Sequence, residues 1–288
     1  MSLPAHKKKP TPSPRLWVVR ARNAPLAVIF RRGPSKQVEL ILWNMRKDSF
    51  ERGQWFKGRI YERRCDLSPD GKYLIYFAAK HTKPFGTWTA ISRPPYLTAL
   101  ALWPKGDCWN GGGWFLSEHG FVLNHPLDQT EMAKGFSLHK FRMEKIALSG
   151  GEDNTVWFNV LERDGWSLMK EGAFQRKGRG WIATEPQTWE KFHSRRKMRL
   201  EMATVGVHSS DRRYDMHFRV FSDESDIVPP SAWDWADWDP SGDLVYAENG
   251  CIHRAKLRQR GIHSSKTLAD FTEDKFSNVS APLLLAKW

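Results

Sequence analysis

Cysteine and long apolar runs are scarce in this chain. Its 288 residues include only three cysteines, Cys65, Cys108 and Cys251, which lie far apart. Three widely spaced cysteines do not make a disulfide framework, so reduced thiols and a cytoplasmic location are expected. The longest apolar stretches, such as residues 97–103, are far shorter than the roughly 20 residues that span a bilayer. The first apolar run, residues 16–19, is shorter than the core of a secretory signal, about 7–15 residues. No membrane partner is therefore expected.

The spacings that mark known catalytic and metal-binding motifs are also missing. The chain has no Gly-x-Ser-x-Gly, Cys-x-x-Cys or His-Glu-x-x-His sequence, the patterns of serine hydrolases and zinc sites. No catalytic residue, metal or cofactor is therefore assigned, and a non-enzymatic function is favoured. A hydrolase stays open as an alternative, because its two carboxylates can be far apart in the sequence.

Glycine is concentrated in one segment, residues 111–113, between Trp109 and Trp114. A nucleotide-binding loop of the P-loop type would end in Gly-Lys-Ser/Thr and open a helix, and neither feature is present here. This segment is therefore predicted to be a mobile loop.

Positive charge is abundant and unevenly distributed. The net charge is +13, and residues 1–22 hold six lysines and arginines with no acidic residue. Residues 1–14 are polar and rich in proline, so they are predicted to form a flexible basic tail. Such a tail suits weak electrostatic attraction to nucleic acid or to acidic partners.

Short runs of apolar residues, separated by turn residues, make up most of the remaining chain. The 15 tryptophans fit this pattern, since large aromatic side chains favour strands and dominate cores. Strands are predicted at residues 27–30, 38–43, 73–78, 156–160 and 244–247. Helices are predicted at residues 187–203, which include a basic run, and at 138–146. The pattern indicates an all-β fold with a small helical insertion at 187–203.

An internal repeat is the most informative feature. Residues 66–76 read DLSPDGKYLIY, and residues 237–246 read DWDPSGDLVY. In both, Pro-x-Gly follows a short extended segment and precedes an apolar strand, which is the chemistry of a tight hairpin turn. A fainter copy covers residues 148–153. The copies are about 80 to 90 residues apart, roughly twice the length of a propeller blade.

At these residues the chain resembles the TolB-like and WD-type β-propeller repeats, in which a short strand, a Ser-Pro-Asp-Gly turn and an apolar strand recur. The resemblance implies a single domain over residues 15–288, an all-β propeller of about five or six four-stranded blades. It also implies a rigid platform for partners, with the strand before each turn innermost in its blade.

The first innermost segment is rich in arginine. Strand alternation places Arg59, Tyr61 and Arg63 on one face and Arg64 on the other. Arginine captures carboxylates and phosphates through two parallel hydrogen bonds, so the segment predicts a site for an anion or an acidic partner. Pairing with nearby acidic residues of the same chain is the structural alternative.

The second innermost segment contains Trp233, Asp234 and Trp235. Two indoles beside a carboxylate predict a platform for a cation, a sugar or a proline-rich peptide. In the alternative interpretation, the indoles pack between blades.

Three functions follow from these observations. The leading hypothesis is a non-catalytic interaction module that binds a protein partner on one face of the ring. The alternative is nucleic-acid or polyanion binding through the tail, the arginine segment 59–64 and the basic segment 191–199. The third is a hydrolase with its carboxylates in the propeller mouth. Residues 27–30 and 283–287 are the segments expected to close the ring.

Overall fold

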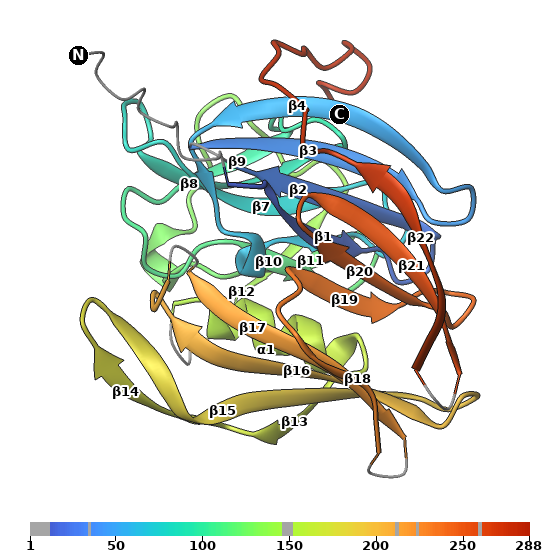
Figure 1. The fold of residues 1–288 in the computed structure, drawn as a ribbon. Helices are drawn as coiled ribbons and strands as arrows, with labels where there is room; N and C mark the ends of the chain where they lie inside the picture. Colours follow the sequence, from blue (N-terminus) through green and yellow to red (C-terminus); the bar gives the residue numbers. More distant parts are fainter. Residues whose placement is uncertain (1–11, 34–35, 146–151, 211–212, 223–224, 259–260) are drawn as a thin grey trace, which may run out of the picture.

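The computed structural model describes residues 12–33, 36–145, 152–210, 213–222, 225–258 and 261–288. The chain is an all-β protein of five sheets, here named A to E in chain order, with one α-helix (Figure 1). Within the described part of the chain, no helix has the length and apolar character needed to cross a membrane. Most of residues 1–14 lie outside the described residues, so the flexible tail stays a prediction.

The first two sheets are built from consecutive antiparallel hairpins. Sheet A runs β1 (Arg15–Arg20), β2 (Leu26–Arg32), β3 (Gln37–Asn44), β4 (Ser49–Lys57). Sheet B contains β5 (Arg59–Ile60), β6 (Asp66–Leu67), β7 (Leu74–Ala79), β8 (Thr87–Ser92), β9 (Ala101–Pro104). Both β5 and β6 pair with β7, and the 3₁₀ turn η1 (Glu62–Arg64) separates them.

The other three sheets follow in the same way. Sheet C contains β10 (Gly113–Phe115), β11 (Gly120–Leu123), β12 (Arg142–Lys145), with the 3₁₀ turn η2 (Leu127–Gln129) between the last two; β11 and β12 are parallel. Sheet D contains β13 (Ser167–Lys170), β14 (Ala173–Lys177), β15 (Gly180–His193), β16 (Met198–Val207), β17 (Tyr214–Ser222), β18 (Ser225–Ser231). Sheet E contains β19 (Trp235–Trp238), β20 (Leu244–Glu248), β21 (Cys251–Arg258), β22 (Gly261–Asp270).

The helix α1 (Asn154–Arg163) replaces the strand predicted at residues 156–160. Its buried side chains Val156, Trp157, Val160 and Leu161 share one face of a helix. That face fits between β10 of sheet C and β13 of sheet D. The strand prediction was wrong because a short apolar run has no period that separates a strand from a buried helix. The helix stops before Gly165, whose φ of 87° breaks the helical path.

Both predicted helices are wrong. Residues 187–203 belong to the long antiparallel strands β15 and β16. Alternation decides the structure there, since Met198, Leu200 and Met202 are buried while the residues between them are partly exposed. Residues 138–145 form a turn and β12, and residue 146 lies outside the described residues. The chain therefore has no helical insertion at 187–203.

The two strong copies of the repeat form matching hairpins. Asp66 pairs with Ile75, and Asp237 pairs with Val245, at the same distance from the turn. The turn glycines Gly71 and Gly242 have positive φ angles of 76° and 86°, which a residue with a side chain adopts at a cost. The fainter copy at 148–153 lies mostly outside the described residues.

Each neighbouring pair of sheets encloses its own apolar layer. Sheets A and B share one layer, B and C another, D and E a third, and E and A a fourth. Between sheets C and D the layer is formed by α1, whose residues pack on β10 on one side and on sheet D on the other. Sheets that follow one another in the chain are therefore packed against each other, directly or through α1.

The first and last sheets also lie side by side, because β1 contacts both β19 and β20. The backbone N–H of Leu16 donates a hydrogen bond to the Asp234 carboxylate at 3.1 Å. Residues 27–30 lie in β2, whereas residues 283–287, expected to be a closing strand, form a turn and bend near the C-terminus.

Carboxylates at equivalent positions of the repeat link neighbouring sheets. Asp66 accepts a hydrogen bond from the backbone of Phe115 at 2.7 Å and forms an ion pair with Arg163. Asp237 forms ion pairs with Arg20 of β1 and Lys191 of β15, both at 2.8 Å. Asp66 therefore fastens sheet B to sheet C and α1, while Asp237 fastens sheet E to sheets A and D.

A buried glutamate couples the outer part of sheet A to pH. The Glu39 side chain is 2% exposed, and its Oε2 has no hydrogen-bond partner within the described residues. Burial and the neighbouring Asp274 raise the pKa of Glu39 to about 7. The folded protein therefore holds this proton more tightly than the unfolded chain between about pH 4.5 and pH 7.

Replacing Glu39 by glutamine should remove a pH-dependent loss of stability. In the wild type, this group lowers the free energy of unfolding as the pH rises through that window, by about 2–3 kcal/mol. E39Q should therefore gain stability relative to wild type between pH 5 and pH 8, measured by urea denaturation at each pH. The exposed Glu51 on β4 gives the control E51Q, whose difference from wild type should not change with pH. A constant difference for E39Q as well would contradict the prediction.

Candidate functional site

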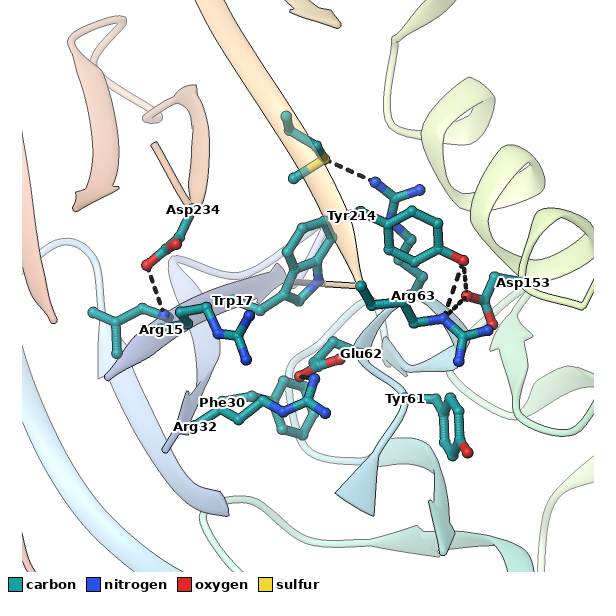
Figure 2. A pocket seen from close by; sticks show the side chains of 13 residues that line it. Arg15, Trp17, Phe30, Arg32, Tyr61, Glu62, Arg63, Asp153, Tyr214 and Asp234 are labelled. Atoms are coloured by element: carbon teal, nitrogen blue, oxygen red, sulfur yellow. Dashed lines mark hydrogen bonds and ion pairs between the residues drawn. The ribbon is translucent and has the colours of Figure 1, made fainter. Parts of the chain in front are cut away.

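An open pocket, here called the central pocket, lies where sheets A, B, D and E meet (Figure 2). The empty space among its walls is about 630 Å³, a figure that includes the open solvent at the mouth. Its walls are formed by Arg15, Leu16, Trp17, Phe30, Arg32, Tyr61, Glu62, Arg63, Asp153, Arg213, Tyr214, Met216 and Asp234.

The wall from sheet B depends on the turn η1. The chain leaves β5 at Ile60, turns through Glu62–Arg64 and returns as β6. A 3₁₀ turn does not alternate as a strand does, so the predicted alternation of Arg59, Tyr61 and Arg63 is wrong. Consequently Arg63 and Arg64 are both buried and point to different surroundings.

Arg64 is a structural anchor. Its side chain is fully buried and forms ion pairs with Asp153 and, at 3.0 Å, with Glu152. Its Nη1 also donates to the backbone carbonyls of Cys108, at 2.7 Å, and Asn110. All of these partners belong to the protein itself, so Arg64 supports the pocket from behind.

The glycine segment packs directly against this anchor. A Cβ atom on Gly112 would lie 2.0 Å from the Arg64 carbonyl oxygen, and φ of Gly112 is +79°. Only glycine permits this close approach. The predicted mobile loop is thus a packed segment that brings β10 against η1.

Asp153 joins sheet B to sheet D. Besides Arg64, its carboxylate pairs with Arg213 at 3.2 Å and accepts a hydrogen bond from the Tyr214 hydroxyl. Burial alone would raise the pKa of Asp153, but the two guanidinium groups and the hydroxyl outweigh it and lower the pKa. The carboxylate is therefore ionised, and its ion pairs and hydrogen bond stabilise the fold.

Arg63 lies in a cage of aromatic rings. Its guanidinium carbon is 3.6 Å from the ring centre of Tyr214, 5.0 Å from that of Trp157 and 5.9 Å from that of Trp17. Its Nη2 lies 2.8 Å from the Met216 sulfur (Figure 2), and sulfur is a weak acceptor.

The Arg63 charge has no acidic partner at ion-pair distance. Among the described residues, no carboxylate oxygen lies within 4 Å of its guanidinium, and the buried Nε has no acceptor. Burial lowers the pKa of Arg63, while Tyr214 and Asp153 oppose this change; an arginine stays charged at neutral pH in any case. A buried guanidinium that lacks a partner and lines an open pocket is suited to an anionic ligand.

Further arginines surround the pocket. Arg32 pairs with Glu62 at 2.9 Å. Arg59 stands over the Tyr61 ring at 4.7 Å, and its buried Nε also has no acceptor among the described residues. Burial, followed by the charge of Arg32, lowers the pKa of Arg59. Positive charge at this end of the pocket therefore exceeds what the nearby acids neutralise.

The structure brings together only part of the predicted site. Tyr61, Arg63 and Asp234 line the central pocket, and Arg59 stacks on its Tyr61 wall. Arg64 is buried behind the wall.

The predicted tryptophan platform is not exposed. Trp233 is 4% exposed and stacks on Tyr246 at 4.2 Å. Trp235 is buried in the apolar layer between sheets A and E. Both indoles therefore follow the alternative interpretation, in which they pack between sheets.

Sequence reasoning missed Trp17, Arg213, Tyr214 and Met216. These residues lie on β1 and at the start of β17, about 200 positions apart, and no motif connects them. The packing of sheet A against sheets D and E brings them together.

The same side chains offer little for a metal or for acid catalysis. Across the described residues, no group of three histidine, cysteine or acidic side chains is arranged to hold a metal ion. The lowered pKa of Asp153 makes it a poor proton donor at neutral pH.

Comparison with known proteins gives no family. No protein-family model matches the chain, and a search of curated proteins finds no significant relative. The function is therefore argued from the pocket alone.

Replacing Asp153 by asparagine should destabilise the protein strongly. The change leaves Glu152 as the one carboxylate, among the described residues, that still pairs with the buried Arg64 and with Arg213. Removing one charge from such a buried cluster costs about 3 kcal/mol, the lower end of the effect for a buried ion pair. Urea denaturation of D153N against the exposed-site control D128N measures the effect. A loss for D153N no larger than that of D128N would show that Asp153 is not the anchor.

Proposed function

We propose that the five sheets are the blades of a propeller-type ring, and that the chain is a non-catalytic binding module whose central pocket takes an anionic group of a partner. The single observation that carries the binding proposal is Arg63, a buried guanidinium without an acidic partner in the wall of an open pocket.

The arrangement of the sheets supports the ring. Neighbouring sheets share apolar layers in chain order, and β1 contacts the last sheet as well as sheet B. The two Pro-x-Gly hairpins of the repeat occupy equivalent inner positions in sheets B and E. The central pocket then lies at one end of the ring axis, where propellers commonly bind their partners.

The lining chemistry supports a carboxylate or phosphate as the bound group. Four arginines line the pocket against three acidic residues, which leaves one positive charge in excess. The aromatic rings around Arg63 exclude water from its faces, so a charged hydrogen bond to its edge is strengthened. Both partner classes expected from the sequence, an acidic protein and a nucleic acid, present such groups.

The hydrolase alternative has less support. Two-carboxylate hydrolysis needs one protonated acid at working pH. In the pocket, Asp153 has a lowered pKa and Glu62 pairs with Arg32. The geometry therefore favours binding.

Removing the Arg63 charge should abolish anion binding. The probe is pyrophosphate, titrated by calorimetry at constant ionic strength kept with sodium chloride. R63M should bind at least about tenfold more weakly than wild type, because a charge-assisted hydrogen bond contributes about 1.5–3 kcal/mol. The exposed Arg46 provides the control R46M, which should bind as wild type does.

The pocket variant needs a folding check by circular dichroism. If R63M is unfolded, R59M replaces it; Arg59 stands over the Tyr61 wall of the pocket, and its loss should weaken binding several-fold. Wild-type protein that gives no pyrophosphate signal, or a folded R63M that binds equally well, would rule the anion pocket out.

A further inference from the structure

The hairpin of β14 and β15 projects from sheet D beyond its neighbouring strands (Figure 1). Its tip carries Arg176, Lys177 and Arg179, all exposed. None of these three cations forms an ion pair or side-chain hydrogen bond within the described part of the chain. The hairpin is therefore a basic arm with unneutralised charge, here called the basic hairpin.

An exposed tryptophan sits at the base of this tip. Trp181 is 46% exposed and pairs across the strands with Arg176 on one side and Val207 on the other. Val207 in turn pairs with Tyr214. Directly paired residues of antiparallel strands lie on the same face, so this row shares one face of sheet D.

This row of paired residues ends at Tyr214, in the wall of the central pocket. Tyr214 lines the pocket and covers Arg63. Trp181 is two strands away from Tyr214, about 10 Å at the usual strand spacing. The exposed indole and the cations beside it are thus continuous with the anion pocket.

A close backbone contact fixes the basic hairpin in this position. A Cβ atom on Gly180 would lie 2.0 Å from the carbonyl oxygen of His208. The His208 N–H donates to the Arg213 carbonyl at 2.8 Å, which closes the loop that ends at the pocket wall. The hairpin tip therefore rests on the same loop that supplies Arg213.

Cations interleaved with an exposed aromatic ring are the chemistry of single-stranded nucleic-acid binding. Bases stack on aromatic side chains, and phosphates pair with arginine and lysine along the strand. An acidic peptide would satisfy the cations but supplies no regular partner for the indole. The observations therefore favour a polynucleotide over an acidic protein.

We propose that single-stranded nucleic acid binds along the basic hairpin, with a base stacked on Trp181 and phosphates on Arg176, Lys177 and Arg179. A further phosphate enters the central pocket at Arg63. This inference rests on the proposed anion pocket, which it extends to a stated ligand.

The stacking step is tested with fluorescein-labelled dT20 and rU20 by fluorescence anisotropy at 50 mM salt. W181A should bind about tenfold more weakly than wild type, since stacking of one base contributes about 1–3 kcal/mol. Phe192, 60% exposed at the far end of the same strand β15, gives the control F192A, which should bind normally.

The phosphate contacts are tested by salt dependence. The triple variant R176Q/K177Q/R179Q should lower the slope of log affinity against log salt by about 2, because each phosphate contact contributes about 0.7 for single strands. The matched control K256Q/R258Q/K266Q removes three exposed cations from the hairpin of β21 and β22 and should leave the slope nearly unchanged.

Pyrophosphate binding separates this inference from the anion pocket. W181A should keep the wild-type affinity for pyrophosphate, and R63M should lose it. No binding of dT20 or rU20, or equal losses in W181A and F192A, overturns the nucleic-acid proposal while leaving the pocket intact. Tighter binding of a labelled ten-residue glutamate peptide than of either oligonucleotide, with the same dependence on Trp181, also overturns it and assigns the surface to an acidic protein.

Discussion

The ion pair between Arg64 and Asp153 is the constraint on which the site depends. Arg64 belongs to η1 in sheet B, while Asp153 immediately precedes α1 and also holds Arg213 and Tyr214 of sheet D. One buried pair therefore joins two sheets and the helix that separates sheets C and D. A fully buried guanidinium tolerates no alternative arrangement, because moving it away from its carboxylates would leave the charge without compensation. The wall of the central pocket is rigid for this reason.

The rigid wall also determines the surroundings of Arg63. The 3₁₀ turn places two adjacent arginines in opposite circumstances, one neutralised by two carboxylates and the other enclosed by aromatic rings with a sulfur as its nearest acceptor. Burying a charge without a partner costs stability. The contacts of Arg64, including the close approach of Gly112, stabilise the turn η1. This stabilisation offsets the cost of burying the Arg63 charge. The exposure of Arg63 to the pocket thus depends on the contacts that hold its neighbour Arg64.

The central pocket is lined by residues from four sheets, so its shape depends on how these sheets pack against one another. The repeated carboxylates Asp66 and Asp237 fasten neighbouring sheets, so the walls keep their spacing. The basic hairpin extends from the same sheet that supplies Tyr214, and Trp181 shares a row with it. Cations and aromatic rings therefore occur together both at the pocket and on the basic hairpin. The outlying Glu39 has no contact with this surface and acts only on the stability of sheet A.

The sequence by itself determined the all-β class, the strands β2, β3, β7 and β20, and the two Pro-x-Gly hairpins, because period-two alternation and turn chemistry are local properties. It also named Tyr61, Arg63 and Asp234 as candidate binding residues, because arginine captures anions and indoles beside a carboxylate suit a platform; their role in binding stays a prediction, although all three line the central pocket. Only the tertiary structure decided that residues 156–160 form a helix and residues 187–203 form strands, because an apolar run takes whichever form its neighbours can bury. The tertiary structure alone also separated Arg63 from Arg64, buried Trp233 and Trp235, and added Trp17 and Tyr214 to the pocket. Whether a charged side chain forms an ion pair depends on segments that are distant in the sequence but adjacent in the fold. Residue spacing along the chain does not show which segments become adjacent.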